Sequence, residues 1–490
     1  MSEEIYLSHT WKDVELLLNQ KIRKSDFILD LSKQFKKELN LPDNVPIIMT
    51  GHQPIIYYPG IFIKLLLADL IARRINGKAY YVVLDTDIET IDWKFIWIND
   101  NTYFQRTFYL SNSKQVLLNQ FIDNYKKIQL QKIIEEWSYR LYHIFEPSII
   151  LHIQYTLEFC RELLNKKILT ISEFSVAINE YLMKQLNVQV QPIYVSELSK
   201  TKSFKEIIKY INKENIRFRD IYNQKLNEFR KNYHIKNPHY PFSNLNENEL
   251  PFWISDGYTR KTLTIYDDFD QNIFPKAITL SICIRIFLSD MMIHGTGGGF
   301  YDLVAEEILL EFFHIQPSPH IVTTATIPTY PKASIPIEYE SSFSIIKKLR
   351  KWKFNPEIFL NDDCFLKKQK LFLIHLKNYY DSQYKKIKRN YRYDNKILND
   401  PVLKENFKQL FYLIEKNPAS YGALIHKEFI KLNHKMHLYT SGIKRQLEKQ
   451  YKKSQLVEYH QKIFYDRTYP AFYYNIKKLK EELENKFLNN

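Results

Sequence analysis

The chain has 490 residues, of which 45% are hydrophobic and 15% aromatic, and 70 Lys and Arg against 55 Asp and Glu give a formal charge of +15. This composition excludes wholesale disorder, and the length predicts two or three structural units. With 10 Gly and 3 Cys, the chain is neither collagen-like nor a disulfide-rich secreted protein.

The excess positive charge lies late in the chain, because residues 341–490 hold 32 of the 70 Lys and Arg. One interpretation is a surface that binds a polyanion. The other is the codon bias of an AT-rich genome, because most of these residues are Lys, whereas Arg makes the bidentate phosphate contacts. Both interpretations stay open.

The cysteines and apolar stretches favour a cytoplasmic protein. Cys160, Cys283 and Cys364 are far apart and form no metal or disulfide pattern, so reduced thiols are expected. The acidic start is unlike a signal peptide. The most apolar stretches, 61–72 and 277–293, are interrupted by charged residues, which indicates core segments and no membrane partner.

The first part of the chain predicts a βαβ unit. A charged amphipathic helix is expected over 10–39, followed by a short apolar run at 45–50. Helical apolar spacing over 60–75 then leads to a second apolar run at 79–84. A strand, a helix and a strand in this order predict a parallel sheet with a right-handed crossover. Residues 1–113 would form the first half of an αβ core.

Residues 114–187 are helical in pattern and predict an insertion. Residues 188–335 would then complete the αβ core. The elements expected in this second half are a strand at 190–195, a helix at 202–231, a hairpin at 253–265, a helix at 300–313 and a strand at 320–327.

Residues 336–490 predict a basic C-terminal region of helices. Hydrophobic residues recur at heptad spacing, which favours a coiled-coil-like appendage and a homo-oligomer formed through it. An ordinary helical bundle is the competing interpretation. The repeating positions are Leu366, Leu373, Tyr380 and Ile387, then Leu403, Phe407, Leu410 and Ile414.

Six of the ten glycines lie in two short segments, and each segment follows an apolar run and precedes an expected helix. In an open α/β sheet this places them at the carboxyl ends of strands, where ligands bind. Glycine at such positions allows close approach of the backbone to a ligand. These residues are Gly51 and Gly60 in the first segment and Gly295, Gly297, Gly298 and Gly299 in the second.

The first segment offers polar groups and a helix start. His52 is a candidate acid or base, and Lys64, one turn into the helix, is a candidate countercharge. The alternative is a proline-stabilised loop in which His52 bonds only to backbone. The residues expected to bind a substrate or nucleotide here are Thr50, Gly51, Gln53, Gly60 and Lys64.

The second segment predicts a nest of main-chain N–H groups for phosphate or carboxylate. It has neither the Walker nor the Gly-x-Gly-x-x-Gly pattern. His294 and Asp302 are expected catalytic residues that could pair across the loop; the alternative is a glycine-rich turn in which Asp302 stabilises the helix start. The expected binding residues are Gly295, Thr296, Gly297, Gly298, Gly299 and Tyr301.

Two further motifs carry weaker hypotheses. Asp85 and Asp87 end the second strand and are candidate Mg²⁺ or ribose ligands, although a solvated acidic loop explains them equally well. The basic and aromatic run at 385–393 suits a nucleic-acid binder, but the solvated face of a long helix is the more common explanation.

The two glycine segments resemble those of the putative cysteine ligases that add cysteine in bacillithiol biosynthesis. Thr50-Gly51-His52-Gln53 is similar to that family's Thr-Gly-Gln-Gln motif, and His294 to Gly299 falls where the family has a Gly-Gly-Pro-Gly loop. The chain is closer to uncharacterised bacterial relatives of that family, and residues 52–60 are also similar to WbqC-like proteins of polysaccharide sugar modification. The resemblance implies an α/β fold with a Rossmann-like parallel sheet core, inserted helical segments and a C-terminal coiled-coil-like region.

The functional hypothesis is a cytoplasmic enzyme of ligase or transferase type that binds an anionic small molecule between the two glycine loops. The candidate cofactor is a nucleotide, ATP or ADP, with Mg²⁺, and the resemblance implies an amino or thiol acceptor. Two alternatives remain. One is a nucleic-acid-associated protein that binds through the basic helices, and the other is a dimeric scaffold that has lost catalysis.

Overall fold

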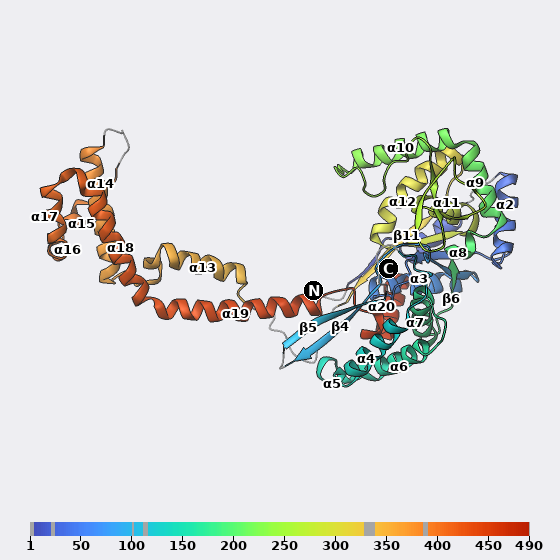
Figure 1. Cartoon of the computed structure of the whole chain (residues 1–490), viewed down its shortest axis with the longest axis horizontal. Coiled ribbons are helices and arrows are strands. Elements are labelled where there is room, and N and C mark those ends of the chain that lie inside the picture. Colours follow the sequence, from blue (N-terminus) through green and yellow to red (C-terminus); the bar gives the residue numbers. More distant parts are fainter. Residues whose placement is uncertain are drawn as a thin grey trace. The chain divides into compact units, whose positions relative to one another are not determined.

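The computed structural model describes residues 4–20, 25–99, 102–110, 116–327, 339–385 and 391–489. They belong to two compact units, whose elements are labelled in Figure 1. Unit 1 contains residues 1–334 and 463–490, and unit 2 contains residues 335–462. The sequence placed 336–490 in one helical region, whereas the contacts assign the last 28 residues to unit 1. Within the described residues, no helix is both long and apolar enough to cross a membrane.

A six-stranded sheet forms the centre of unit 1, in the order β1-β11-β10-β2-β3-β6. Five strands are parallel, as the sequence predicts, and the N-terminal strand β1 adds antiparallel to β11. The sequence did not predict β1. The strands are β1 (Glu4–Leu7), β2 (Ile47–His52), β3 (Lys78–Val83), β6 (Val190–Tyr194), β10 (Met291–His294) and β11 (His320–Thr326).

Helices cover both faces of this sheet. On one face, a single hydrophobic cluster joins Met49, Val82 and Met292 of the strands to the short helix α8 (Val195–Leu198) and to five longer helices. On the other face, α3 (Pro59–Arg74) lies across β2, β3 and β11, with α20 (Ile476–Asn489) packed on it. Figure 1 shows the two groups on opposite sides of the sheet. The five helices are α2 (Asp26–Glu38), α9 (Lys202–Lys213), α10 (Asn215–Asn232), α11 (Ala277–Cys283) and α12 (Thr296–Ile308).

Two long helices expected from the sequence are divided in the structure. The helix expected over 10–39 is α1 (Trp11–Leu18) and α2, because Thr10 and Asp13 form a capping box for a short first helix that ends at Asn19. The helix expected over 202–231 is α9 and α10, which are separated at Glu214.

The sheet reverses its direction of winding between β2 and β10. From β2 the chain passes through α3 to β3, whereas from β10 it passes through α12 to β11, which lies the other way. Because both crossovers are right-handed by rule, α3 and α12 must lie on opposite faces. Such a switch point leaves a crevice at the carboxyl ends of the two adjacent strands. Both glycine segments follow these two strands.

Several elements are inserted around the core. The sequence did not predict the antiparallel pair β4 (Asp92–Asn99) and β5 (Thr102–Tyr109). The 114–187 region is helical as expected, and the expected 253–265 hairpin is the β7–β8 pair of a three-stranded sheet. The elements are α4 (Asn124–Ser138), α5 (Leu141–Ile144), α6 (Pro147–Leu164), α7 (Ile171–Gln185), α8 (Val195–Leu198), β7 (Glu249–Ser255), β8 (Arg260–Thr264) and β9 (Asn272–Pro275).

The described part of unit 2 is helical, and its seams form one core. Leu373, Leu410, Ile414 and Ile425 are buried in a single cluster where α14 and α17 pack on α18. Ile387 and residues 386–390 of the basic run lie outside the described residues. The helices are α13 (Ser342–Phe354), α14 (Phe365–Tyr384), α15 (Asn395–Leu398), α16 (Pro401–Asn406), α17 (Lys408–Lys416), α18 (Tyr421–Tyr439) and α19 (Ser441–Phe464), whose last residues belong to unit 1.

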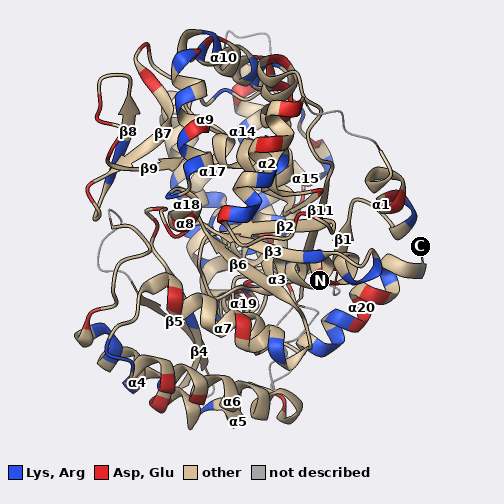
Figure 2. Cartoon of the chain, turned by 90° about the vertical axis from the view of Figure 1, so that its right-hand side faces the viewer, with Lys and Arg blue, Asp and Glu red and all other residues tan. Residues whose placement is uncertain are grey.

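The last segment of the chain is built into unit 1. Tyr473 accepts a hydrogen bond from Trp93 Nε1 at 3.0 Å and donates one to the Lys94 carbonyl at 2.9 Å. Ala471 N donates to the Tyr57 carbonyl at 2.7 Å, which holds the loop before α3. Acidic and basic residues are interspersed along α20, as the ribbon colours of Figure 2 show. The C-terminal residues therefore help to shape the first glycine segment.

We predict that Phe472→Ala lowers the free energy of unfolding of unit 1 by about 3–5 kcal/mol, because this fully buried ring packs edge-to-face on Trp93 and its loss leaves a cavity. Urea titration followed by tryptophan fluorescence measures it, since five of the six tryptophans lie in unit 1. The control is Phe27→Ala at a 58% exposed position, with an expected change within about 1 kcal/mol. Equal effects would contradict the assignment of this segment to the core.

Candidate functional site

A cavity of about 980 Å³ lies in unit 1 and is lined from both glycine segments. Its size is at the upper end of the range for small-molecule sites and is sufficient for a nucleotide. The structure therefore brings together the ends of β2 and β10, as the sequence predicts. The predicted residues that line it are Gly51, His52, Gln53, Gly60, Lys64, Asp87, His294, Gly295, Thr296, Gly297, Gly298 and Tyr301.

Four predicted residues lie outside this lining. Thr50 Oγ1 donates to the Ile293 carbonyl at 2.8 Å and so joins β2 to β10. A Cβ atom on Gly299 would collide with Val322, so this glycine allows α12 to approach β11. Asp302 lies behind His294, and Asp85 is held elsewhere, as described below.

Lys64 is a buried cation in the cavity wall. Its side chain is buried, and its Nζ donates to the Gly51 carbonyl at 2.7 Å. Within the described residues, no carboxylate forms an ion pair with it. Burial lowers the pKa of Lys64 from 10.5 to about 7. Around neutral pH, this amine exists in both its charged and its neutral form.

His52 is neutral across the physiological range. Burial, with a smaller contribution from Lys64, lowers its pKa to about 3. Its ring lies edge-on to Tyr57, and its Nδ1 is 3.3 Å from the Gln53 carbonyl. The loop is fixed by Asn179, which accepts from Tyr57 N and donates to the Ile55 carbonyl, both at 2.9 Å. His52 can therefore offer a hydrogen bond but no charge.

The N-terminus of α12 presents unpaired N–H groups to the cavity. The first backbone hydrogen bond of this helix runs from Gly299 N to the Gly295 carbonyl at 2.9 Å, and no side chain caps the helix. The N–H groups of Thr296, Gly297 and Gly298 precede this bond and lack helical acceptors. Together with the helix dipole they favour an anion.

Gly298 lies directly over His294. A Cβ atom on Gly298 would come within 3.1 Å of His294 Nδ1, so glycine lets the loop approach the ring. His294 Nε2 is 3.1 Å from Asp302 Oδ2. Since an ionised carboxylate only accepts, Nε2 carries the hydrogen and Nδ1 is left as the acceptor on the side of the glycine loop.

Behind His294 lies a buried network of charges. Arg285 donates to Asp302 at 2.6 Å and forms an ion pair with Glu306 at 2.7 Å, and Glu306 bonds to His320 Nδ1 at 2.9 Å. Burial raises the pKa of Asp302, but His294 and Arg285 outweigh it and hold that pKa well below 3.8. Burial lowers the pKa of His294, with Asp302 opposing. The result is a neutral imidazole oriented by an ionised carboxylate.

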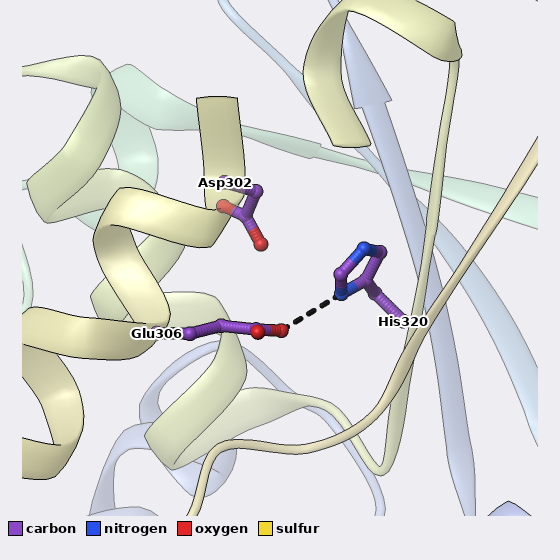
Figure 3. A group of neighbouring side chains, drawn as sticks. All are labelled: Asp302, Glu306 and His320. Carbon is purple, nitrogen blue, oxygen red and sulfur yellow. Dashed lines mark hydrogen bonds and ion pairs between the residues drawn. The ribbon is translucent and has the colours of Figure 1, made fainter. Parts of the chain in front are cut away.

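Asp302, Glu306 and His320 also have the composition of a metal site. Their ligand atoms lie within 4.8 Å of one another, and Figure 3 shows them converging between α12 and β11. However, the Arg285 guanidinium already occupies acceptor oxygens of both carboxylates. A cation placed there would be repelled by a buried cation, so these residues do not fit a metal ion.

The two strand-end aspartates have separate partners. Asp85 accepts from Ser196 N at 3.0 Å and from Ser196 Oγ at 2.5 Å. Asp87 accepts from Arg260 at 2.5 Å and from Gln53 at 3.1 Å. Burial raises the pKa of Asp85, with the Ser196 bonds opposing. The expected sharing of Mg²⁺ by Asp85 and Asp87 does not fit this arrangement.

Sequence reasoning missed a second wall of the cavity. Trp253 has Arg260 and Lys276 at 4.6 and 4.4 Å from its ring centroid, and Lys276 forms an ion pair with Glu249. Arg467, from the C-terminal segment, also lines the cavity. The predicted hairpin was the available signal for Trp253 and Arg260, whereas nothing in the local pattern points to Arg467.

Comparison of the chain with models of known protein families and with curated proteins finds no match.

We predict that Arg285→Met destabilises unit 1 by about 3–5 kcal/mol, because it leaves Asp302, Glu306 and the Ser318 carbonyl without their buried partner. Urea titration of tryptophan fluorescence measures the loss. The matched control is Lys209→Met, which removes a 72% exposed partner of Glu206 and is expected to change stability by less than about 1 kcal/mol. A small effect of Arg285→Met would mean that the network is not a structural unit.

Proposed function

We propose that this chain is an enzyme of ligase or transferase type that binds an anionic small molecule in the crevice between β2 and β10. One observation carries the proposal: a buried lysine without an acidic partner and an uncapped, glycine-rich helix N-terminus line the same cavity. Each of these features is stabilised by a negative charge that the described residues do not supply.

A nucleotide is the leading candidate for this molecule. Its phosphates would lie between Lys64 and the N-terminus of α12, and its base against the aromatic wall. In that wall, Phe242 and Tyr301 are in edge-to-face contact at 5.2 Å, and Tyr222 and Trp253 also line the cavity. Aromatic faces are sequence-tolerant platforms for bases.

His294 would be the proton acceptor of the reaction, with Asp302 as a residue that positions it. His52 would donate or accept a hydrogen bond at the other glycine loop. The resemblance to cysteine-adding enzymes supports an amino or thiol acceptor and a Rossmann-like description of the sheet, and the isolated cysteines favour a cytoplasmic location. The proposal includes a coiled-coil-like C-terminal region and a homo-oligomer formed through its helices. Sedimentation of the full chain tests the oligomer.

The second candidate function is nucleic-acid binding through unit 2. The concentration of Lys and Arg beyond residue 340 favours it. The two functions differ in salt dependence. Duplex DNA binding weakens with a log–log slope of about −0.9 per contacted phosphate, and nucleotide binding in a buried cavity is much less sensitive to salt.

We predict that ATP or ADP raises the melting temperature of the full chain. The Gly297→Ala variant should need at least about tenfold more ligand for the same rise. A Cβ at Gly297 meets no protein atom within 4 Å, so the fold tolerates it, but the methyl group enters the cavity where the anion would lie. A thermal-shift titration with ATP, ADP, nucleotide sugars and Mg²⁺ measures both.

The matched control is Gly442→Ala, a helical glycine of unit 2 with equally open surroundings. It should leave the ligand shift unchanged. A ligand shift that survives Gly297→Ala would remove the N-terminus of α12 from the binding site.

A further inference from the structure

We infer that Lys64 is the counter-ion of the substrate's anionic group and that its amine takes up a proton from solvent when the anion binds. The inference rests on the proposed function and adds to it a charge state and a direction of proton flow. It begins from geometry: Lys64 lines the cavity, is 4% exposed, and donates from Nζ to the Gly51 carbonyl.

The surroundings of Lys64 favour a neutral amine in the free protein. A buried ammonium ion without a counter-ion is costly, and burial accordingly brings the pKa of Lys64 down to about 7. The hydrogen bond to the Gly51 carbonyl does not favour the charged amine of Lys64 over the neutral one, because both forms can donate it. His52, with a pKa near 3, supplies no charge.

The other ionisable groups near α3 do not replace a counter-ion. Asp69, in α3 itself, pairs with Arg73 at 2.9 Å, and the α20 glutamates Glu482 and Glu484 lie 3.4 and 3.9 Å from lysines of α20. The other carboxylate on the described elements packed against α3 is Glu481 of α20, which is exposed and therefore does not compensate a buried amine. The remaining ionisable groups carry no negative charge at neutral pH: Arg74 on α3, His52 on β2, Lys78, Tyr80 and Tyr81 on β3, Tyr194 on β6, His294 on β10, His320 on β11, and Lys477 and Lys486 on α20.

An anion bound beside Lys64 shifts the equilibrium between the neutral and the charged amine. A negative group near Nζ favours the ammonium form, so the pKa of Lys64 is higher in the complex than in the free protein. Below about pH 7 the amine is already charged, and binding is strongest and takes up no proton. Above about pH 7 binding must first protonate the amine, so affinity falls by up to tenfold per pH unit until the pKa of the complex is reached.

Sulfate is a suitable probe because its charge is constant over this range. We propose calorimetric titration of the full chain with sulfate from about pH 6 to about pH 9, in two buffers of different ionisation enthalpy. The expected result is a constant Kd up to about pH 7, a rising Kd above it, and an uptake at higher pH that approaches one proton per sulfate. The difference between the buffers gives the proton count directly.

Two variants of Lys64 separate charge from titration. Lys64→Arg keeps a cation that does not deprotonate, so the pH dependence and the proton uptake should both disappear. Lys64→Met should lower sulfate affinity at least about tenfold at pH 6. The matched control is Lys209→Met: this exposed lysine is paired with Glu206 and does not line the cavity, so its loss should leave both Kd and its slope against pH unchanged.

The outcomes distinguish the inference from the proposed function. Sulfate binding with a constant Kd and no proton uptake in the wild-type chain would overturn the role of Lys64 and leave the anion site in place. If neither sulfate nor ATP binds at any pH, the proposed function itself fails. The wild-type proton count decides the matter even if Lys64→Met does not fold.

Discussion

The parallel pairing of β10 with β2 is the interaction on which the rest of unit 1 depends. These strands are about 240 residues apart in the sequence, and their register is fixed by Asp290, whose carboxylate accepts from Ile47 N at 2.8 Å while its own N donates to the Ile47 carbonyl. Side chains alternate between the faces of a strand, so a slip of one residue would turn His294 away from Asp302. The geometry of the His294–Asp302 pair and the position of both glycine loops thus follow from one register.

Burial decides which charges the cavity presents. The cations of the aromatic wall are balanced, Arg260 by Asp87 and Lys276 by Glu249. The two histidines are kept neutral by burial. The cations that remain are the exposed Arg467 and the buried Lys64, and Lys64 and the N-terminus of α12 both lie at the switch point of the sheet. The attraction for an anion therefore arises locally, and the net charge of +15 for the whole chain contributes little to it.

Local patterns in the sequence were sufficient for the parallel sheet and for the ends of its strands. Apolar runs bounded by Gly, Pro or Asp marked β2, β3, β6 and β11, and the unusual concentration of glycine marked the loops that line the cavity. Patterns of this kind report periodicity and backbone freedom within a few residues of one another. They were uninformative for Asp85, because an aspartate at a strand end can turn to a ligand or, as here, to the backbone N–H of Ser196 in α8, which follows the neighbouring strand β6.

The features that the sequence did not reveal depend on contacts between distant segments. Arg285 interrupts the apolar stretch at 277–293, and from the sequence alone it argues only against a membrane span. In the structure it is the centre of the network that orients His294. Its partners at 302, 306 and 318 are brought to it by a π-helical turn over Ile284–Leu288 and by the return of the chain through α12. A single arginine in an apolar run carries no sign of how many acceptors will surround it.

The C-terminal segment shows the same limit most clearly. Hydrophobic residues at helical spacing predicted a single helical region over 336–490, but spacing does not say which surface a helix will bury. In the structure Asp466 accepts from Lys94 at 3.0 Å and from Gln105 at 2.9 Å, which fixes the segment where Arg467 lines the cavity. Since these residues follow unit 2 in the chain, the cavity wall can be completed only after unit 2 has been synthesised, and long-range contacts of this kind form late in folding. The last 28 residues therefore help to build the site, and the αβ core is formed from chain segments on both sides of unit 2.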